Sequence, residues 1–440
     1  MDHFMENAPA TIDPVELNFK HNFIVNVLDV AFFFTGYSFL STAVIIPLFI
    51  SNLSDSKLLI GLSGVIGATG YFLPQLFTAS FTEKAPVKRD LVVNVGFFAE
   101  RLPVILMPLA ALAAFKSAAL ALFAFFLLYT AHSFGAGSLA VAWQEMIAKI
   151  FPANRRGRFM GLGMTIGTGT GIAGAMAAAW LLDHLVFPYG YLVCFSLAGL
   201  FMLISWSFLR LSREEPSPPR ENTDSYWEFF RKLPAIFKND GNFRWFLIGQ
   251  LVLNLGGMAW VFLAVYTRNR WGLSDGAVGT YNTALLIGQA IGNLALGLWA
   301  DRRGYYQVMV LSGIGAVLAL ILSIFVPTPG WMYLVFGLRG ISMGGFILAS
   351  LMVLEFGAEA DRPAYIGINS TATGFMGMVA PMVGGWIAQF AGYIPMFVFS
   401  TIFTIIGVIL LAAFVHEPRR RLSSSEEPAR LTEIAGRLSN

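Results

Sequence analysis

Five ionisable side chains lie inside long apolar stretches of this sequence. They are Asp29, Glu100, Arg101, His132 and Arg339. A charged side chain at the centre of a membrane costs about 3 kcal/mol, so it is kept mainly where it pairs, faces water or binds a ligand. Asp29 and His132 each lie about 9 Å along their helices from the expected inner boundary, and histidine titrates near neutral pH. The pattern favours Asp29 and His132 as a proton-coupling pair, with a structural hydrogen bond between helices as the alternative.

Arg339 is the basic residue buried deepest in the second half of the chain, about 12 Å from the expected outer boundary of its stretch. A guanidinium there suits the anionic group of a solute, or pairs with an acid when no solute is bound. Glu100 and Arg101 are adjacent, and adjacent residues on a helix do not face each other. We therefore expect Glu100 and Arg101 to find separate partners in a structural network.

Uncharged amides give further candidates. Asn22, Asn26 and Asp29 follow the spacing i, i+4, i+7, so they share a helix face that should point into the protein. Amides suit solutes that carry hydroxyl or amide groups, but they also hydrogen-bond neighbouring membrane helices. The candidate residues for substrate binding or coupling are therefore Asp29, Asn26, His132, Arg339, Gln250 and Asn254.

The composition indicates the elements that hold these residues. Of 440 residues 56% are hydrophobic and only 12% are charged, about half of the ~25% charged residues of a soluble chain. A membrane helix needs about 20 mostly apolar residues. Twelve stretches qualify: 22–50, 57–82, 91–115, 117–146, 159–183, 190–210, 244–267, 277–300, 307–326, 331–355, 365–390 and 393–415. We expect an all-α membrane protein with twelve transmembrane helices.

The basic residues predict the orientation. If the N-terminus is inside and the spans alternate, the inner side holds 23 of the 29 Lys and Arg, the outer side four, and the spans two. Basic residues collect on the cytoplasmic side, and the first 21 residues lack the features of a secretory signal. We expect both termini to be cytoplasmic, and the short loops suggest a bacterial inner (plasma) membrane.

One connection is longer than the others and divides the chain into two sets of six spans. The predicted organisation is a cytoplasmic tail 1–21, a six-helix bundle 22–210, a cytoplasmic linker 211–243, a second six-helix bundle 244–416 and a cytoplasmic tail 417–440. Within the linker, residues 226–237 have the pattern of a short amphipathic helix on the membrane surface.

The two halves repeat short motifs. The segment LSDSKLLIG at 53–61 is echoed by LSDGAVG at 273–279, and a constant offset of 218 residues aligns Gly61 with Gly279 and Gly70 with Gly288. Two parallel repeats related by an axis along the membrane normal are a known transporter architecture. The echo predicts two pseudo-symmetric six-helix bundles.

The segment GLWADRRG at 297–304 resembles the signature Gly-x-x-x-Asp-Arg-x-Gly of the major facilitator superfamily. The family has this signature between spans two and three, with a fainter copy between spans eight and nine. Here the second copy is the cleaner one, and the first, ASFTEKAPVKR at 79–89, has Ala79 and Pro86 where glycines are usual. The resemblance implies the fold of that family, two bundles that rock about a central cavity.

The same segments predict a gate at the inner ends of the helices. An acid at a helix C-terminus opposes the helix dipole, so Asp301 needs a partner such as Arg302, Arg303, Arg362 or the amides that start the eleventh span. The resemblance implies that contacts of Asp301 and Glu83 form when the inner side is closed. The candidate gate residues are Glu83, Lys84, Gly297, Asp301, Arg302, Gly304, Arg156 and Arg362.

Three further expectations concern packing, the cavity and the gate. Gly163, Gly167 and Gly171 are spaced four apart, which lets helices approach closely. Aromatic residues expected in a central cavity are Tyr37, Tyr71 and Trp260. Glu145, near the inner end of its span, is expected to pair with Arg155, Arg156 or Arg362.

We expect secondary active transport of a small organic solute by alternating access, driven by protons, although a uniporter remains open. The alternatives are a drug or amphipathic-compound efflux antiporter and, from another class, a non-transporting membrane sensor or scaffold. An enzyme is not expected, because the histidines are scattered along the chain. We expect no cofactor, no metal, no nucleic-acid partner and a monomer in the lipid bilayer.

Overall fold

The computed structural model describes residues 14–216, 238–356 and 362–417, and in these parts every regular element is helical. Nine of the described helices are long and apolar enough to span a membrane. Three more crossings complete the predicted twelve: two are interrupted midway, and the third, α17, contains Pro381. The predicted amphipathic helix at 226–237 lies outside the described residues.

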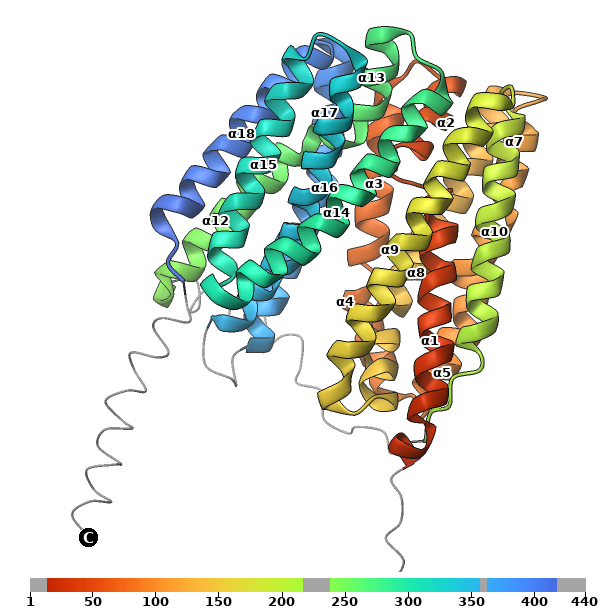
Figure 1. Ribbon diagram of the computed structural model, residues 1–440, viewed down its shortest axis with the longest axis vertical. Helices are drawn as coiled ribbons and strands as arrows, with labels where there is room; N and C mark the ends of the chain where they lie inside the picture. The colour runs from red at the N-terminus through yellow and green to blue at the C-terminus, as the bar shows by residue number, and fades with distance from the viewer. Residues whose placement is uncertain (1–13, 217–237, 357–361, 418–440) are drawn as a thin grey trace, which may run out of the picture.

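The first half of the chain forms six crossings (Figure 1). These are α1 (Pro14–Ser38) with α2 (Ile45–Leu53), α3 (Lys57–Phe72) with α4 (Gln75–Lys84), the run α5 (Lys88–Asp90), η1 (Leu91–Val95), η2 (Phe97–Arg101), α6 (Leu102–Leu106) and α7 (Pro108–Ala113), then α8 (Ala118–Ile150), α9 (Ala153–His184) and α10 (Tyr189–Leu209). The first crossing starts at Pro14, earlier than the expected residue 22. Pro74 stands at the break between α3 and α4, where a residue without an N–H is tolerated because the helix restarts there.

The second half repeats this arrangement. Its crossings are α12 (Gly241–Gly256) with η3 (Gly257–Phe262) and α13 (Leu263–Trp271), α14 (Asp275–Arg303), α15 (Tyr305–Phe325), η4 (Pro329–Trp331) with α16 (Met332–Ala349) and η5 (Ser350–Glu355), α17 (Arg362–Phe390) and α18 (Tyr393–Phe414). Helix α1 begins and helix α18 ends at the same end of the molecule (Figure 1), which we call the basic end. The opposite end, where α14 begins, we call the closed end.

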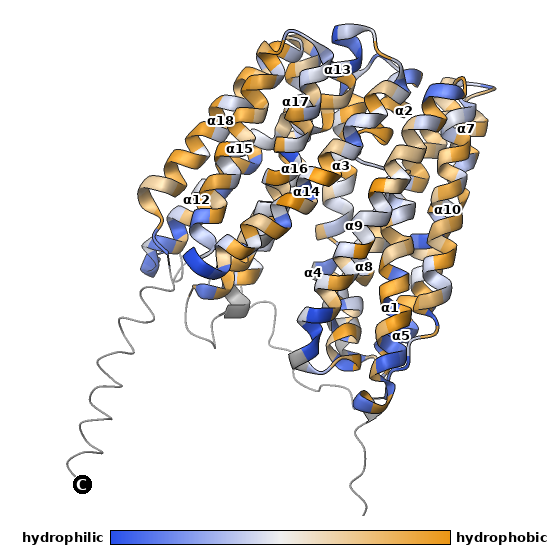
Figure 2. Cartoon of the chain, viewed as in Figure 1, coloured by the Kyte–Doolittle hydropathy of each residue, from blue (hydrophilic) through white to orange (hydrophobic). Residues whose placement is uncertain are grey.

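Apolar side chains cover the outside of both halves. Figure 2 shows hydrophobic residues along the length of the helices and hydrophilic residues gathered mainly at their ends. Large side chains such as Phe77 and Phe98 are 65% and 68% exposed. In water, such exposed apolar surface would promote aggregation. The pattern is that of an integral membrane protein that crosses the bilayer several times.

Glycines confirm the repeat that the sequence predicts. A Cβ on Gly70 of α3 would lie 2.5 Å from Ser133 of α8, and one on the equivalent Gly288 of α14 would lie 2.1 Å from the carbonyl of Gly337 of α16. Both glycines therefore allow the second and fourth crossings of a half to touch. Gly167 similarly lies against Phe34 of α1, with 2.8 Å from its ideal Cβ to the ring.

In each half, one asparagine near the beginning forms hydrogen bonds with the backbone near the end. Asn22 donates to the carbonyl of Arg213 at 2.9 Å and accepts from the Arg213 amide at 2.8 Å. Asn242 does the same with His416, at 3.0 and 2.9 Å. The first helix of each half is thus joined to the segment that follows its sixth helix, at equivalent places.

The next residue in each half is a glutamate that caps the third helix. Glu214 accepts from the amides of Lys88 and Arg89 at 3.0 and 2.6 Å, and Glu417 accepts from the amide of Tyr306 at 3.2 Å. Carboxylates are favourable at helix N-termini because these have free N–H groups and positive dipole ends. Together the asparagine and the glutamate tie the first, third and sixth crossings of each half into one unit.

Candidate transport cavity

A cavity of about 750 Å³ lies between the two halves. The first half supplies most of the wall, from α1, α3, α8, α9 and the third crossing, and the second half adds a smaller set around Trp260, Phe336 and Arg339. Its aromatic lining comprises Phe33, Phe34, Tyr37, Tyr71, Phe72, Tyr129, Trp143, Phe159, Trp260 and Phe336. Cavities of 300–1,000 Å³ hold small organic molecules.

The structure places Asp29 and His132, the predicted coupling pair, in the lining of this cavity. Asp29 of α1 accepts a hydrogen bond from the Ser205 hydroxyl at 2.6 Å. His132 of α8 lies with Nδ1 3.0 Å from the carbonyl oxygen of Glu100. A carbonyl can only accept, so Nδ1 carries the hydrogen and Nε2 is the nitrogen that can take up a proton.

Glu100 and Arg101 form an ion pair with each other at 2.9 Å, and both line the cavity. The expectation of separate partners is therefore wrong. The reason is local: residues Leu91–Val95 and Phe97–Arg101 are π-helical, and the wider π turn rotates neighbouring residues by a smaller angle than an α turn does. Arg101 also lies over the ring of Phe33 at 4.8 Å, so the third crossing contributes directly to the wall.

Arg339 of α16 faces the cavity from the opposite half. Its guanidinium lies 4.3 Å from the centre of the Trp260 ring, a cation–π contact worth about 1–2 kcal/mol. Within the described residues, no carboxylate forms an ion pair with Arg339. Tyr37, Tyr71 and Trp260 also line the cavity, as expected.

Three candidate amides lie elsewhere. Asn26 donates to Ser212 at 2.9 Å and to the carbonyl of Asn22, because its face of α1 packs toward the segment after α10. Asn254 donates to the carbonyl of Gln250 one turn earlier at 2.8 Å. Asn26, Gln250 and Asn254 are not among the cavity-lining residues. Asn26 instead contributes to helix packing, and the Asn254 side chain hydrogen-bonds a carbonyl of its own helix.

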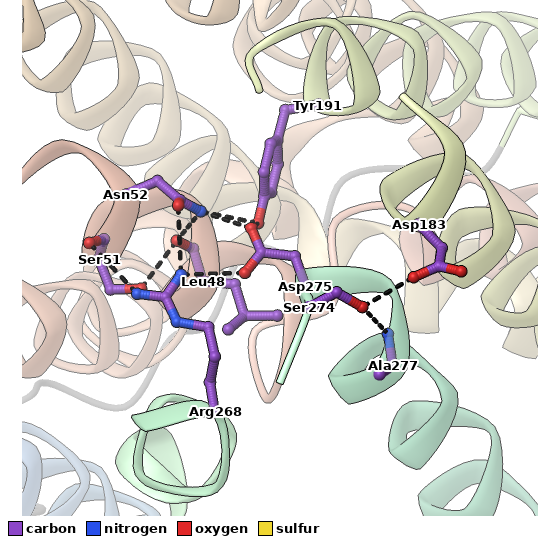
Figure 3. A network of polar contacts seen from close by, with 9 residues as sticks. All are labelled: Leu48, Ser51, Asn52, Asp183, Tyr191, Arg268, Ser274, Asp275 and Ala277. Atoms are coloured by element: carbon purple, nitrogen blue, oxygen red, sulfur yellow. Dashed lines mark hydrogen bonds and ion pairs between the residues drawn. The ribbon is translucent and has the colours of Figure 1, made fainter. Parts of the chain in front are cut away.

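Polar contacts join the two halves at the closed end (Figure 3). Asp275, the first residue of α14, accepts from Asn52 at 2.5 Å and from the hydroxyl of Tyr191 at 2.7 Å, both from the first half. Arg268 of the second half binds the other carboxylate oxygen at 2.9 Å. Beside this cluster the Ser274 hydroxyl donates to Asp183 at 2.7 Å. The sequence marks Ser274 and Asp275 as a helix start, but it does not indicate that Asp275 joins the halves.

Close helix contacts accompany these bonds. A Cβ on Gly276 would lie 2.3 Å from Asp183, and one on Gly61 would lie 2.6 Å from the carbonyl of Pro381. α14 therefore packs on α9, and α17 packs on α3. The repeat-related glycines Gly61 and Gly279 both serve this inter-half packing.

Among the described residues, the hydrogen bonds between the halves lie at the closed end rather than the basic end. Asp301 and Arg302 are exposed, and no ion pair or hydrogen bond of their side chains occurs in the described parts of the chain. Lys84 is exposed, and Gly297 is half-buried within α14. Gly304, with φ of 90°, turns the chain into α15. The side chains of Glu83 and Arg362 are not described.

Arg156 and Glu145 are engaged within the first half. Arg156 binds the carbonyl of Phe151 at 3.0 Å, at the C-terminus of α8. Glu145 pairs with Lys88 at 3.3 Å rather than with the expected arginines. Lys88 lies closer because α5 packs on α8.

Two repeated bundles of six helices around a shared cavity define a membrane transporter of the two-domain kind. Residues 28–267 and 251–438 match the Major Facilitator Superfamily. The chain belongs to that family.

Relatives and solved structures agree with this assignment. The chain is 25% identical to a gallate transporter of Pseudomonas putida over 40% of this chain and 39% of that protein. It is 26% identical to the MFS-type transporter pynF of Aspergillus niger over 49% of this chain and 47% of that protein. The matches thus span less than half of these relatives. Crystal structures of a nucleoside transporter NupG variant (TM-score 0.70, 14% identity, 90% of this chain and 100% of that chain) and of a D-xylose-proton symporter (TM-score 0.68, 14% identity, 90% and 98%) share the fold.

Proposed function

We propose that this protein carries a small organic solute across the membrane by alternating access, with protons as the driving ion. The observation that carries the proposal is the cavity at the seam of the two halves, which holds Asp29, His132 and Arg339, together with the hydrogen bonds of Asp275 that join the halves at one end. A carrier needs a site that both halves share, so that rocking of one half against the other changes the side from which the site is reached.

Proton coupling is assigned to the cluster in the first half. Asp29 and the His132 ring can each take up a proton, and the Glu100–Arg101 ion pair lies in the same wall. Protonation of Asp29 removes a charge from the cavity, which makes movement of the loaded carrier less costly. The name of one structural neighbour, a D-xylose-proton symporter, supports coupling of this type in the fold.

The basic end is assigned to the cytoplasm, on the distribution of Lys and Arg, with both termini there and the protein in a bacterial inner membrane as a monomer. We assign this structure to the inward-open state of the cycle, because the described residues make few contacts between the halves at the basic end. Asp301 and Glu83 are then latch residues that engage when the basic end closes.

Efflux of amphipathic compounds is the second candidate, because aromatic rings dominate the lining. The names of a gallate transporter and of a nucleoside transporter favour small polar metabolites instead. A sensor without transport has no need of ionisable groups in a cavity that both halves share.

Uptake into proteoliposomes tests the proposal. The panel is 4-hydroxybenzoate, uridine, D-xylose and ethidium, each with and without an imposed pH gradient. Accumulation of one compound that depends on the gradient supports proton-coupled carriage, and gradient-driven export of ethidium alone supports efflux. Absence of flux for all four contradicts the proposal.

A further inference from the structure

We propose that the cavity binds an aromatic organic anion, with its carboxylate on Arg339 and its ring among the aromatic side chains. The proposal deepens the proposed function and rests on it for the biological meaning, but the binding claim stands on the geometry of the cavity. Three observations carry it: Arg339 has no carboxylate partner among the described residues, its guanidinium lies over a tryptophan ring, and uncharged polar groups are few in the lining.

The charged residues of the described lining leave Arg339 without a carboxylate partner. Among the charged residues of the lining, Glu100 is paired with Arg101 at 2.9 Å, and Asp29 is held by Ser205 at 2.6 Å. Both acids belong to the first half. Arg339 lies in the second half and, in the described parts of the chain, has an aromatic ring rather than a carboxylate beside it. A guanidinium out of bulk water without an anion is costly, so a ligand carboxylate is its natural complement.

The geometry of Arg339 suits recognition of a planar acid. The guanidinium lies over the Trp260 ring at 4.3 Å, and this contact restricts the orientations that its five N–H donors can take. A carboxylate can then accept two parallel hydrogen bonds from the edge of the guanidinium. Arg339 is half-buried and lines the cavity, so its edge is reachable from within.

The rest of the wall suits an aromatic ring better than a polyol. Tyrosine, tryptophan and His132 aside, the uncharged polar side chains of the described lining are Thr42, Ser133 and Gln144. A sugar exposes hydroxyl groups all round, and each of them loses water that these few groups replace only in part. Phe33, Phe34 and Phe336 instead offer faces and edges against which a ring packs.

The test compares an acid with its neutral analogue in purified protein. The probes are 4-hydroxybenzoate and 4-hydroxybenzamide, which have similar shape and differ in charge, and binding is measured by calorimetry. Wild type should bind the acid at least tenfold more tightly than the amide. Arg339→Gln should weaken binding of the acid by roughly 10- to 100-fold, the scale of a charged hydrogen-bonded pair, and change binding of the amide little. Arg339→Lys should fall between them.

A matched control exists in the chain. Arg210 lies over the ring of Trp206 at 5.7 Å, exposed and away from the cavity. Arg210→Gln therefore removes an arginine from a tryptophan without touching the proposed site, and it should leave both affinities unchanged.

Three outcomes overturn the proposal: equal affinity for acid and amide, no binding of either, or wild-type affinity for the acid in Arg339→Gln. Failure of the proposed function looks different. In that case the acid binds in an Arg339-dependent manner, but proteoliposomes show no flux.

Discussion

Tyr191 of the sixth crossing donates its hydroxyl hydrogen to Asp275 at the start of the eighth, with 2.7 Å between the oxygens. The two residues belong to different halves and are 84 positions apart in the chain. Asp275 also accepts from Asn52 and Arg268, so one carboxylate gathers donors from both halves. A motion that separates the halves at this end has to break the bonds from Tyr191 and Asn52.

Asp275→Asn should open the closed end. The amide keeps the shape but loses the charge, and hydrogen bonds to a charged group contribute about 1.5–3 kcal/mol. The population open at this end should rise roughly tenfold or more. Spin labels on Val186→Cys and Asn269→Cys, both exposed and in different halves, with Cys194→Ala as background, report the distance distribution. An unchanged distribution would remove Asp275 from the gate.

Gly276→Val should have a similar effect for a steric reason. The ideal Cβ at Gly276 lies 2.3 Å from Asp183, so α14 and α9 cannot meet if a side chain is added. Gly169→Val on α9 is the control, because nothing lies within 4 Å of its ideal Cβ. The same spin-label pair should lengthen in the first variant only; lengthening in both, or in neither, contradicts the packing described.

Asn22→Ala and Asn242→Ala should each lower the free energy of unfolding by about 1–3 kcal/mol, because each leaves two backbone groups without partners. The two asparagines are buried and lie in different halves, so their effects should add. Denaturation in detergent micelles measures them, with Asn269→Ala as an exposed control. If either variant had the same free energy of unfolding as wild type, the hydrogen bonds of Asn22 and Asn242 would not be equivalent in strength.

Asp29→Asn should separate binding from proton coupling. In wild type, higher pH on the side of solute entry should reduce uptake of 4-hydroxybenzoate, because fewer carriers hold the coupled proton. Ser205, Arg101, Glu100 and His132 are the polar and titratable groups around this part of the wall. The asparagine mimics the protonated acid, so exchange should persist without pH dependence while accumulation stops.

Glu145→Gln is the control for this experiment, since Glu145 pairs with Lys88 outside the cavity lining. It should keep the pH dependence of wild type. Accumulation by Asp29→Asn at the wild-type level would assign coupling to another group.

The sequence predicts the parts of the fold that follow from periodicity and repetition. Hydropathy gives the twelve crossings, and the offset between Gly70 and Gly288 predicts a contact that recurs in both halves. Asp29, His132 and Arg339 are predicted as functional candidates because an ionisable group inside a membrane needs a polar neighbour or water, and the structure places all three in the cavity lining.

Other features depend on how helices meet, which spacing alone does not specify. Asn26 shares a helix face with Asp29, yet it contacts Ser212, because one broad face of α1 meets both the cavity and α10. The Glu100–Arg101 pair depends on a π-helical segment that no residue pattern marks. The role of Asp275 requires two helix ends from different halves to approach, and the sequence shows only that it starts a helix.

Cross-linking of the closed end tests the central claim, that the halves rock about the cavity. Ser274→Cys and Asp183→Cys replace a pair of side chains 2.7 Å apart in different halves, in the Cys194→Ala background. Proteoliposomes with the oxidised pair should take up no 4-hydroxybenzoate, and reduction should restore uptake to the level of the singly substituted proteins. Undiminished uptake by the cross-linked protein would contradict alternating access through this end.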